Sequence, residues 1–214
     1  MIVALRMSFE YREAWITHYF HDGGNGPRSG ILYVGKLNRH KGLKETCQAY
    51  VSLSSFVDEP LYLVGRGTDR DNFQRTGFFL DDHDLLDFRH AVERCKVVLK
   101  GELPPGELRE YYRKAKVLVL PSLTEGFPLS VLEALACGTP VVASNVGSVG
   151  DVVRNGHNGF TVPKGCIEEL VTATLRTIAS FEKMNPNCRP SIEGFTSEEM
   201  VGKYRSLFAR LAGG

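Results

Sequence analysis

Two carboxylates stand eight residues apart, Glu125 just before a predicted helix and Glu133 within its second turn. The peptide N–H groups at the start of a helix have no intrahelical partners, and with the helix dipole they favour a phosphate. Acidic side chains beside a phosphate site are reasonable when they bind neutral hydroxyls of the same ligand. We therefore predict a ligand whose phosphate is joined to sugars on both sides. In the alternative interpretation, Glu125 only stabilises the helix start and Glu133 is an exposed helix residue.

A buried strand and a helix must position these two carboxylates. The apolar run 117–120 predicts a fully buried parallel strand. Pro128 suits the first position of a helix of about three turns, Gly138 suits its end, and residues 141–143 predict the next strand. The loop that holds Glu125 then lies at the carboxyl end of a strand, where open α/β sheets bind ligands.

Two lysines are predicted to lie across from this helix start. Lys36 and Lys41 follow the predicted strand 31–35. In a doubly wound sheet the first and fourth strands are neighbours that flank the point where the strand order reverses. The two lysines could therefore hold a diphosphate and stabilise its negative charge as it leaves. In the alternative interpretation, a lysine pair around Arg39 and His40 is an ordinary surface feature.

Strands alternate with helices along the rest of the chain. This alternation predicts an α/β fold, a Rossmann-like, doubly wound parallel sheet of about six strands. Besides the segments given above, strands are expected at 61–65, 97–99 and 160–162, and helices at 43–54, 69–75, 84–95, 106–115, 166–181 and 197–211. Residues 1–29, with an aromatic stripe of Tyr11, Trp15 and Tyr19, are expected to be a linker or docking segment, and residues 30–214 the main domain.

Composition excludes several classes of protein. A net charge of +1 in 214 residues argues against a nucleic-acid-binding protein. Five cysteines without a C-x-x-C pair predict reduced thiols, which fit a cytoplasmic protein without a disulfide framework or zinc site. No apolar run is long enough for a signal peptide or a membrane span.

Two other patterns are weak cofactor signals. Gly65 and Gly67 form only a fragment of the dinucleotide fingerprint, because Arg70 stands at the third glycine position. The acidic cluster 81–84 is interpreted as a polar loop. We therefore expect neither an NAD site nor a metal.

Three segments carry a family resemblance. VGKLNRHKG, YLVGRGTDR and LPSLTEGFPLSVLEALACGTPVVASNVG resemble the carboxyl-terminal, donor-binding domain of retaining GT-B glycosyltransferases of group 1, with family 4 the most similar group. The resemblance runs from about Ile31 to Leu211, and the E-x7-E spacing of Glu125 and Glu133 belongs to it. It implies that 30–214 is a nucleotide-sugar-binding domain and that the chain is a single carboxyl-terminal half of such an enzyme.

The resemblance also assigns roles to residues. It implies that Glu125 contacts hydroxyls of the donor sugar, that Glu133 contacts the ribose, and that Lys41 binds the diphosphate. Lys36 stands where the family usually has arginine, so the charge is kept and the bidentate fork is lost. Glu125, Lys41 and Lys36 are thus the expected catalytic residues. The remaining donor-binding residues are Gly126, Phe127, Pro128, Leu129, Gly35, Arg66 and Leu103. A nucleobase slot is expected near Arg66 and Leu103.

Two departures from the family pattern bear on function. Residues 147–151 replace a frequent Gly-Gly-x-Pro-Glu, and only about 29 residues precede the donor domain. The acceptor is therefore expected on an amino-terminal domain or a partner subunit, and the resemblance allows peripheral membrane association of the full enzyme. The expected reaction moves a sugar from a nucleoside diphosphate without a metal, and this chain alone is expected to be inactive. A non-catalytic nucleotide-sugar-binding module and a GT-B-like epimerase or phosphorylase remain alternatives.

Overall fold

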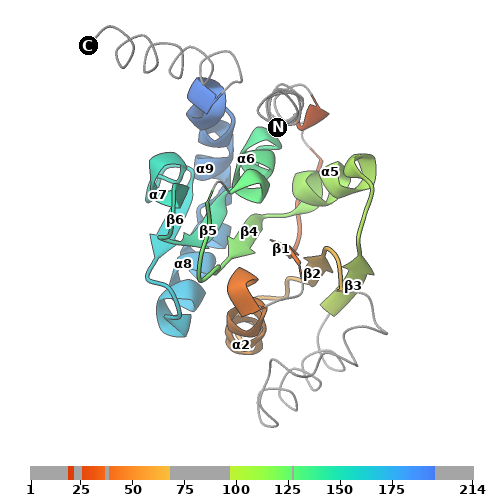
Figure 1. Ribbon diagram of the computed structural model, residues 1–214, viewed down its shortest axis with the longest axis vertical. Helices are drawn as coiled ribbons and strands as arrows, with labels where there is room; N and C mark the ends of the chain where they lie inside the picture. The colour runs from red at the N-terminus through yellow and green to blue at the C-terminus, as the bar shows by residue number, and fades with distance from the viewer. Residues whose placement is uncertain (1–18, 22–25, 37–38, 68–96, 127, 196–214) are drawn as a thin grey trace, which may run out of the picture.

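A parallel sheet forms the centre of the protein. The computed structural model describes residues 19–21, 26–36, 39–67, 97–126 and 128–195. Within them lies one six-stranded sheet with the strand order β3-β2-β1-β4-β5-β6 (Figure 1). Its strands are β1 (Ile31–Val34), β2 (Leu61–Val64), β3 (Val97–Gly101), β4 (Val117–Leu120), β5 (Val141–Ser144) and β6 (Gly159–Val162). The predicted doubly wound α/β fold is confirmed, and β1 and β4 are neighbours as expected.

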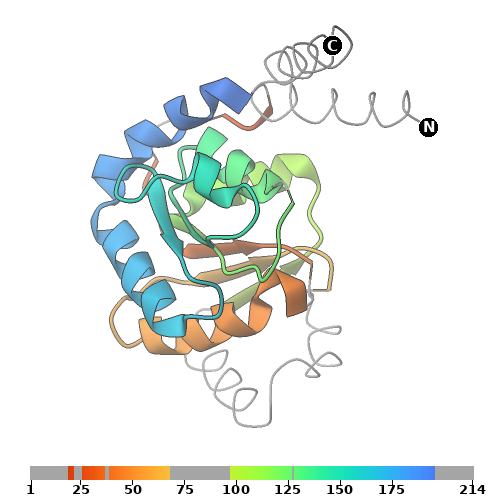
Figure 2. The ribbon, with the colours of Figure 1, turned by 60° about the vertical axis from the view of Figure 1, so that its left-hand side comes forward.

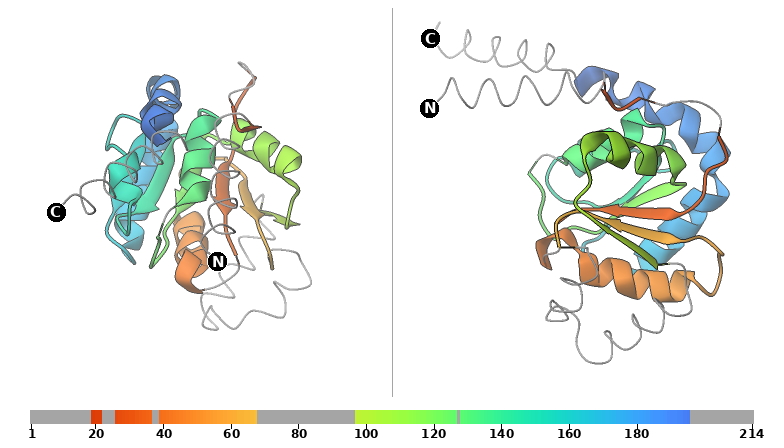
Figure 3. Two further views of the ribbon diagram at one scale, coloured as in Figure 1. Left: turned by 45° about the horizontal axis from the view of Figure 1, so that its top comes forward. Right: turned by 90° about the vertical axis from the view of Figure 1, so that its right-hand side faces the viewer.

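Helices cover both faces of the sheet (Figures 2 and 3). One face carries α2 (Leu43–Leu53) and α8 (Ile167–Ala179). The opposite face carries α5 (Pro105–Lys114), α6 (Leu129–Ala136), α7 (Val149–Val152), α9 (Phe181–Cys188) and the 3-10 helix η3 (Pro190–Phe195). A further 3-10 turn, η1 (Arg39–Lys41), precedes α2. No helix of the described residues is long and apolar enough to cross a bilayer.

The alternation of side chains along each strand divides the interior into two cores. In β4, Leu118 and Leu120 pack with α5 and α6, whereas Val117 and Val119 pack with α2 and α8. All four residues of this strand are at most 1% exposed. A strand that is covered on both faces needs apolar residues at every position, which explains the uninterrupted apolar run in the sequence.

Two predicted helices differ from the observed ones. The helix after Pro128 has eight residues, about two turns rather than three. The helix predicted at 166–181 ends at Ala179, and α9 follows it. The four-residue α7 was not predicted, because so short a segment has no measurable periodicity. The helices expected at 69–75, 84–95 and 197–211, and the residues Tyr11 and Trp15, lie outside the described residues.

The described residues just before the sheet pack on α5. Phe20 is 1% exposed, and its ring meets that of Tyr112 edge-on with centroids 5.7 Å apart. Arg109 donates to the carbonyl of Tyr19 over 3.3 Å, and Arg113 to that of His21 over 2.8 Å. These contacts are compatible with a docking segment, although the boundary between 1–29 and 30–214 stays a prediction.

Glu59, which precedes β2, joins the amino ends of the two central strands, β1 and β4. Its carboxylate accepts hydrogen bonds from the backbone N–H of Gly30 before β1 and from the ammonium of Lys116 before β4, at 2.5 and 2.6 Å. Ser29 donates to the same carboxylate over 3.0 Å. Burial opposes ionisation of Glu59, but these bonds outweigh it and hold the pKa of the carboxyl below its usual 4.5. Glu59 therefore stabilises the sheet as an anion.

We expect Glu59→Gln to lower the free energy of unfolding by about 1–2 kcal/mol at neutral pH, because a hydrogen bond to a charged group is lost. Since the folded pKa is depressed, the contribution of Glu59 is complete above the unfolded value of about 4.5 and is lost as the pH falls through the folded pKa. Urea unfolding of both proteins over a range of pH measures this. The difference between them should shrink in acid, and a difference independent of pH would contradict the role of the charge.

Candidate functional site

The candidate site lies where the carboxyl ends of β1 and β4 meet. Both strands run parallel, with Ile31 beside Val117 and Leu32 beside Leu118. The loop after β1 carries Lys41, and the loop after β4 carries Glu125. Since β2 and β3 lie to one side and β5 and β6 to the other, this edge is the point where the strand order reverses.

Lys41 and Glu125 form an ion pair across this edge. The Lys41 ammonium donates to both carboxylate oxygens of Glu125, at 2.8 and 2.9 Å. The hydroxyl of Ser122, a fully buried residue, donates to Oε1 of the same carboxylate over 2.7 Å. The Glu125 side chain is 6% exposed and that of Lys41 33%. The structure thus brings together two of the predicted catalytic residues, with Lys41 as the more accessible member.

The two loops are also joined through their backbones. The N–H of Leu123 donates to the carbonyl of His40 over 2.8 Å. Gly42 adopts a left-handed φ of 69°, and a Cβ there would lie 2.0 Å from the carbonyl oxygen of Pro121. Only glycine permits such an approach, so Gly42 holds the η1 turn, and with it Lys41, against the loop of Glu125.

The start of α6 forms a third part of the site. Its N-cap is Pro128, whose side chain makes no capping hydrogen bond, and the first turn contains no acidic residue. The first backbone bond back to Pro128 comes from Val131, so the N–H groups of Leu129 and Ser130 precede the helical ladder. Space is open beside Gly126, where an added Cβ would meet no atom within 4 Å. Phe127 lies outside the described residues.

Glu133 occupies the second turn of α6, as predicted. It is half-buried, and its Oε2 accepts a hydrogen bond from the hydroxyl of Tyr112 over 2.8 Å. Tyr112 lies on α5 and is fully buried. Burial, and after it the charge of Glu133, raises the pKa of Tyr112 well above its ordinary value. Glu133 is therefore not an exposed helix residue, as the alternative interpretation required.

Lys36 follows the carboxyl end of β1. Its side chain is exposed, and its backbone carbonyl accepts a hydrogen bond from Tyr33 over 3.2 Å. Burial is the main cause that raises the pKa of Tyr33, so the phenol keeps its proton and donates. Gly35 leaves room for this hydroxyl, since a Cβ there would lie 3.1 Å from it. The charge of Lys36 also helps to lower the pKa of Glu102, although Arg66 is the main cause.

The residues of the predicted nucleobase slot lie at the ends of β2 and β3. Arg66 forms an ion pair with Glu102 at 3.1 Å, and both side chains are more than 60% exposed. The hydrogen bonds of this pair raise the pKa of Arg66, and so exposed a pair contributes little to stability. Leu103 is half-buried and packs on the core beneath α5. The nucleobase slot stays a prediction.

The structure also shows residues that the sequence did not single out. Ser122 and Tyr112 hold the two carboxylates, and the Ser148 hydroxyl donates to the carbonyl of Gly126 over 3.0 Å. Ser122 lies three residues before Glu125, and a loop serine at this spacing could have been predicted to donate a hydrogen bond to the carboxylate. Tyr112 lies on another helix, and no local pattern indicates its contact with Glu133.

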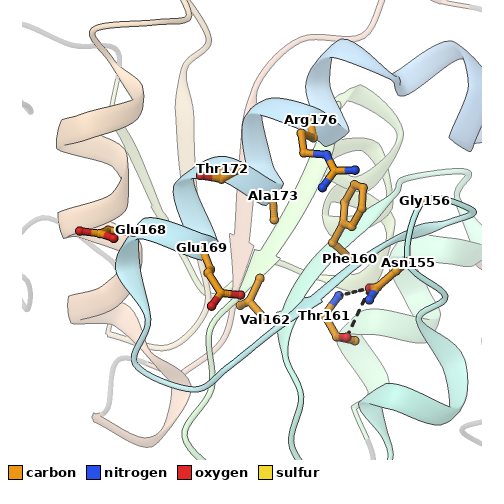
Figure 4. Close-up of a pocket in the computed structure, with 10 residues that line it drawn as sticks. All are labelled: Asn155, Gly156, Phe160, Thr161, Val162, Glu168, Glu169, Thr172, Ala173 and Arg176. Carbon is orange, nitrogen blue, oxygen red and sulfur yellow. Dashed lines mark hydrogen bonds between the residues drawn. The ribbon is translucent and has the colours of Figure 1, made fainter.

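An open groove of about 580 Å³ lies elsewhere, between β6 and α8 (Figure 4). The Arg176 guanidinium lies over the Phe160 ring, 4.6 Å from its centroid. Asn155 accepts the backbone N–H of Thr161 over 2.7 Å and so satisfies a polar group on the edge strand. None of the predicted site residues lines this groove. Within the described part of the chain, no group of three or more His, Cys, Asp or Glu is placed to hold a metal, and the cluster 81–84 lies outside it.

Known proteins resemble this chain in sequence. The sequence model described as glycosyl transferases group 1 matches residues 28–180, more than half of the chain. The chain belongs to this glycosyltransferase family. An uncharacterised glycosyltransferase from Methanocaldococcus jannaschii is 35% identical over 132 residues, which are 62% of this chain and 31% of the relative.

Solved glycosyltransferases share the fold. Sucrose-phosphate synthase from Thermosynechococcus elongatus superposes with a TM-score of 0.71 at 26% identity, over 91% of this chain and 51% of that one. The pneumococcal O-GlcNAc transferase, solved in complex with UDP and GlcNAc, gives 0.67 at 19% identity, over 91% and 38%. The chain has the fold of the carboxyl-terminal domain of a GT-B glycosyltransferase, and it spans between about a third and a half of these proteins.

The close approach of Gly42 to Pro121 can be tested by substitution. Gly42→Ala adds a left-handed alanine, which costs about 1–2 kcal/mol, and also a backbone clash. Gly165→Ala is the matched control, because its φ of 77° is similar and its Cβ would meet no atom within 4 Å. Urea unfolding should show a clearly larger loss of stability for Gly42→Ala, and equal losses would mean that the two loops do not need this contact.

Proposed function

We propose that this chain is the donor-binding half of a retaining glycosyltransferase of the family 4 type. It binds a nucleoside-diphosphate sugar, and the sugar passes to an acceptor held by an amino-terminal domain or a partner subunit. The observation that carries this proposal is the meeting of Lys41, Glu125 and the uncapped start of α6 at the β1–β4 edge. The pneumococcal transferase with UDP and GlcNAc, which shares the fold, supports this class of ligand.

The chemistry required of the site is the departure of a diphosphate. The bond between the anomeric carbon and the diphosphate oxygen breaks, and that oxygen keeps the electron pair. The oxygen of the acceptor hydroxyl bonds to the same face of the sugar, and the hydroxyl proton passes to the departing diphosphate. Lys41 and the first amides of α6 supply positive charge and N–H donors where negative charge develops, and no metal is required for this. Lys36, whose side chain is exposed, adds a second cation at the same edge.

The two carboxylates serve different hydroxyl-bearing parts of this donor. Glu125 is adjacent to the cation that would bind the diphosphate, so its carboxylate would accept hydrogen bonds from the transferred sugar. Glu133 lies one turn into α6 and would accept those of the ribose. Transfer also needs the acceptor hydroxyl held against the anomeric carbon, which can be worth about 7–11 kcal/mol of barrier. We therefore propose that the chain alone binds the donor without transferring the sugar.

Titration of the chain with a panel of nucleoside diphosphates tests the proposal, and Lys41→Ala sharpens it. We expect Lys41→Ala to weaken binding about ten- to hundredfold, because a charge-assisted hydrogen bond is lost. The salt dependence of binding should become flatter, since exposed charges are screened by salt. Lys183→Ala, an exposed lysine on α9, is the control and should leave both unchanged. An unaltered salt slope in Lys41→Ala would remove Lys41 from the diphosphate site.

Glu125→Gln should distinguish the contribution of the sugar to binding affinity from that of the diphosphate. The substitution removes the anion that neutralises Lys41, so a nucleoside diphosphate should bind at least as tightly as to the wild type. The additional affinity that the sugar confers should fall about tenfold, because hydrogen bonds to a charged acceptor are lost. Calorimetric titration with the diphosphate and its sugar conjugate measures both. Equal weakening of the two ligands would contradict a role of Glu125 at the sugar.

A further inference from the structure

Tyr112 presents its hydroxyl to Glu133 from a fixed position. The hydroxyl lies 2.8 Å from Oε2, and Tyr112 itself is 0% exposed. A buried phenol needs a hydrogen-bond partner, and a main-chain carbonyl would serve that purpose as well as a carboxylate. Here the partner is instead the one acidic residue that α6 contains.

Three contacts fix Tyr112 itself. Its ring packs edge-on against Phe20, with centroids 5.7 Å apart. Its carbonyl accepts a short hydrogen bond from the hydroxyl of Thr139, which is 0% exposed, and a longer one of 3.4 Å from Arg28. The hydroxyl of Tyr112 therefore has little freedom to move away from Glu133.

The chemistry of this pair leaves Glu133 able to bind a ligand. Because burial raises the pKa of Tyr112, the phenol stays protonated and acts as a donor at neutral pH. An ionised carboxylate has about four lone-pair sites, so it can accept from Tyr112 and from ligand hydroxyls together. A glutamate has three rotatable bonds, and holding them before the ligand arrives lowers the entropy lost on binding.

We propose that Tyr112 is a positioning residue that orients the carboxylate of Glu133 toward the neighbouring hydroxyls of a ribose. This inference rests on the proposed function, in which Glu133 contacts the ribose. Tyr112 does not touch the ligand itself. Its role is to hold the Glu133 side chain, which contacts the ligand, in one conformation.

The test compares two ligands that differ only in the ribose. For each variant, the dissociation constants of a nucleoside diphosphate and of its 2′,3′-dideoxy analogue are measured by calorimetry, and their ratio is the ribose preference. Tyr112→Phe removes one oxygen and should lower the preference about two- to tenfold. Inorganic pyrophosphate, which has no ribose, should bind to Tyr112→Phe and to the wild type with the same affinity. Tyr50→Phe is the matched control, because Tyr50 is also buried and donates to the carbonyl of Glu59 over 2.9 Å, within α2 and its following loop.

The outcomes separate this inference from the proposed function. Glu133→Gln should lose most of the preference, and adding Tyr112→Phe to it should change the preference no further, as expected of two residues that act as a unit. If Glu133→Gln loses the preference and Tyr112→Phe keeps it, the positioning role is wrong and the proposed function stands. If the wild type binds no nucleoside diphosphate, or shows no ribose preference, the proposed function is wrong and the inference with it.

A second variant covers the case in which Tyr112→Phe does not fold. Glu133→Asp keeps the carboxylate and withdraws it from Tyr112 by one methylene group. Its ribose preference should fall toward that of Glu133→Gln. A preference at the wild-type level would show that the carboxylate works without being held by Tyr112, and would overturn the inference.

Discussion

The carboxylate of Glu59 ties the amino ends of β1 and β4 together, and the geometry of the candidate site depends on the register of these two strands. It joins the residues just before β1 and β4, and it lies just before β2 itself. Each of these strands has only four residues. A slip of one residue would displace one strand by about 3.3 Å along its neighbour. Lys41 and Glu125 could not then keep a contact of 2.8 Å at the opposite ends of β1 and β4.

The two carboxylates of the site have the same chemistry and different surroundings. Glu125 accepts hydrogen bonds from a cation in η1 and from a loop hydroxyl, and in the proposed function its ion pair with Lys41 would loosen or be shared with the diphosphate. Glu133 accepts a hydrogen bond from the neutral phenol of Tyr112 on a packed helix, and this contact does not itself compete with a ligand anion. This difference agrees with Glu125 as the residue that responds to the reacting part of the donor and Glu133 as a fixed anchor.

The sequence predicted most of the fold because β1, β2, β4 and β5 are short, mostly apolar runs, and because the segments containing α2, α5, α6 and α8 carry helical patterns between or after them. The adjacency of β1 and β4 could be predicted from the strand order of doubly wound sheets alone. The direct bond between Lys41 and Glu125 could not be predicted, since it joins side chains 84 positions apart at ångström precision. The contact of Tyr112 with Glu133 could not be predicted either. Most residues of α5 are polar or charged, and its sequence does not distinguish Tyr112 as the buried one. Arg66 was predicted as a ligand residue, and only the structure shows that Glu102 is its neighbour.

Helix α6 is held at the end that does not face the site. Arg28, from the segment before the sheet, donates to the carbonyl of Cys137 at 2.9 Å and to the hydroxyl of Thr139 at 3.0 Å. A cation at the carboxyl end of a helix is stabilised by the helix dipole. At the amino end, by contrast, the N-cap residue Pro128 supplies no side-chain hydrogen bond to the first N–H groups of the helix. Since Arg28 and Phe20 also contact Tyr112, the segment before the sheet fixes both α6 and the residue that holds its glutamate. The candidate site is therefore supported, through α5 and α6, by residues that precede the sheet in the sequence.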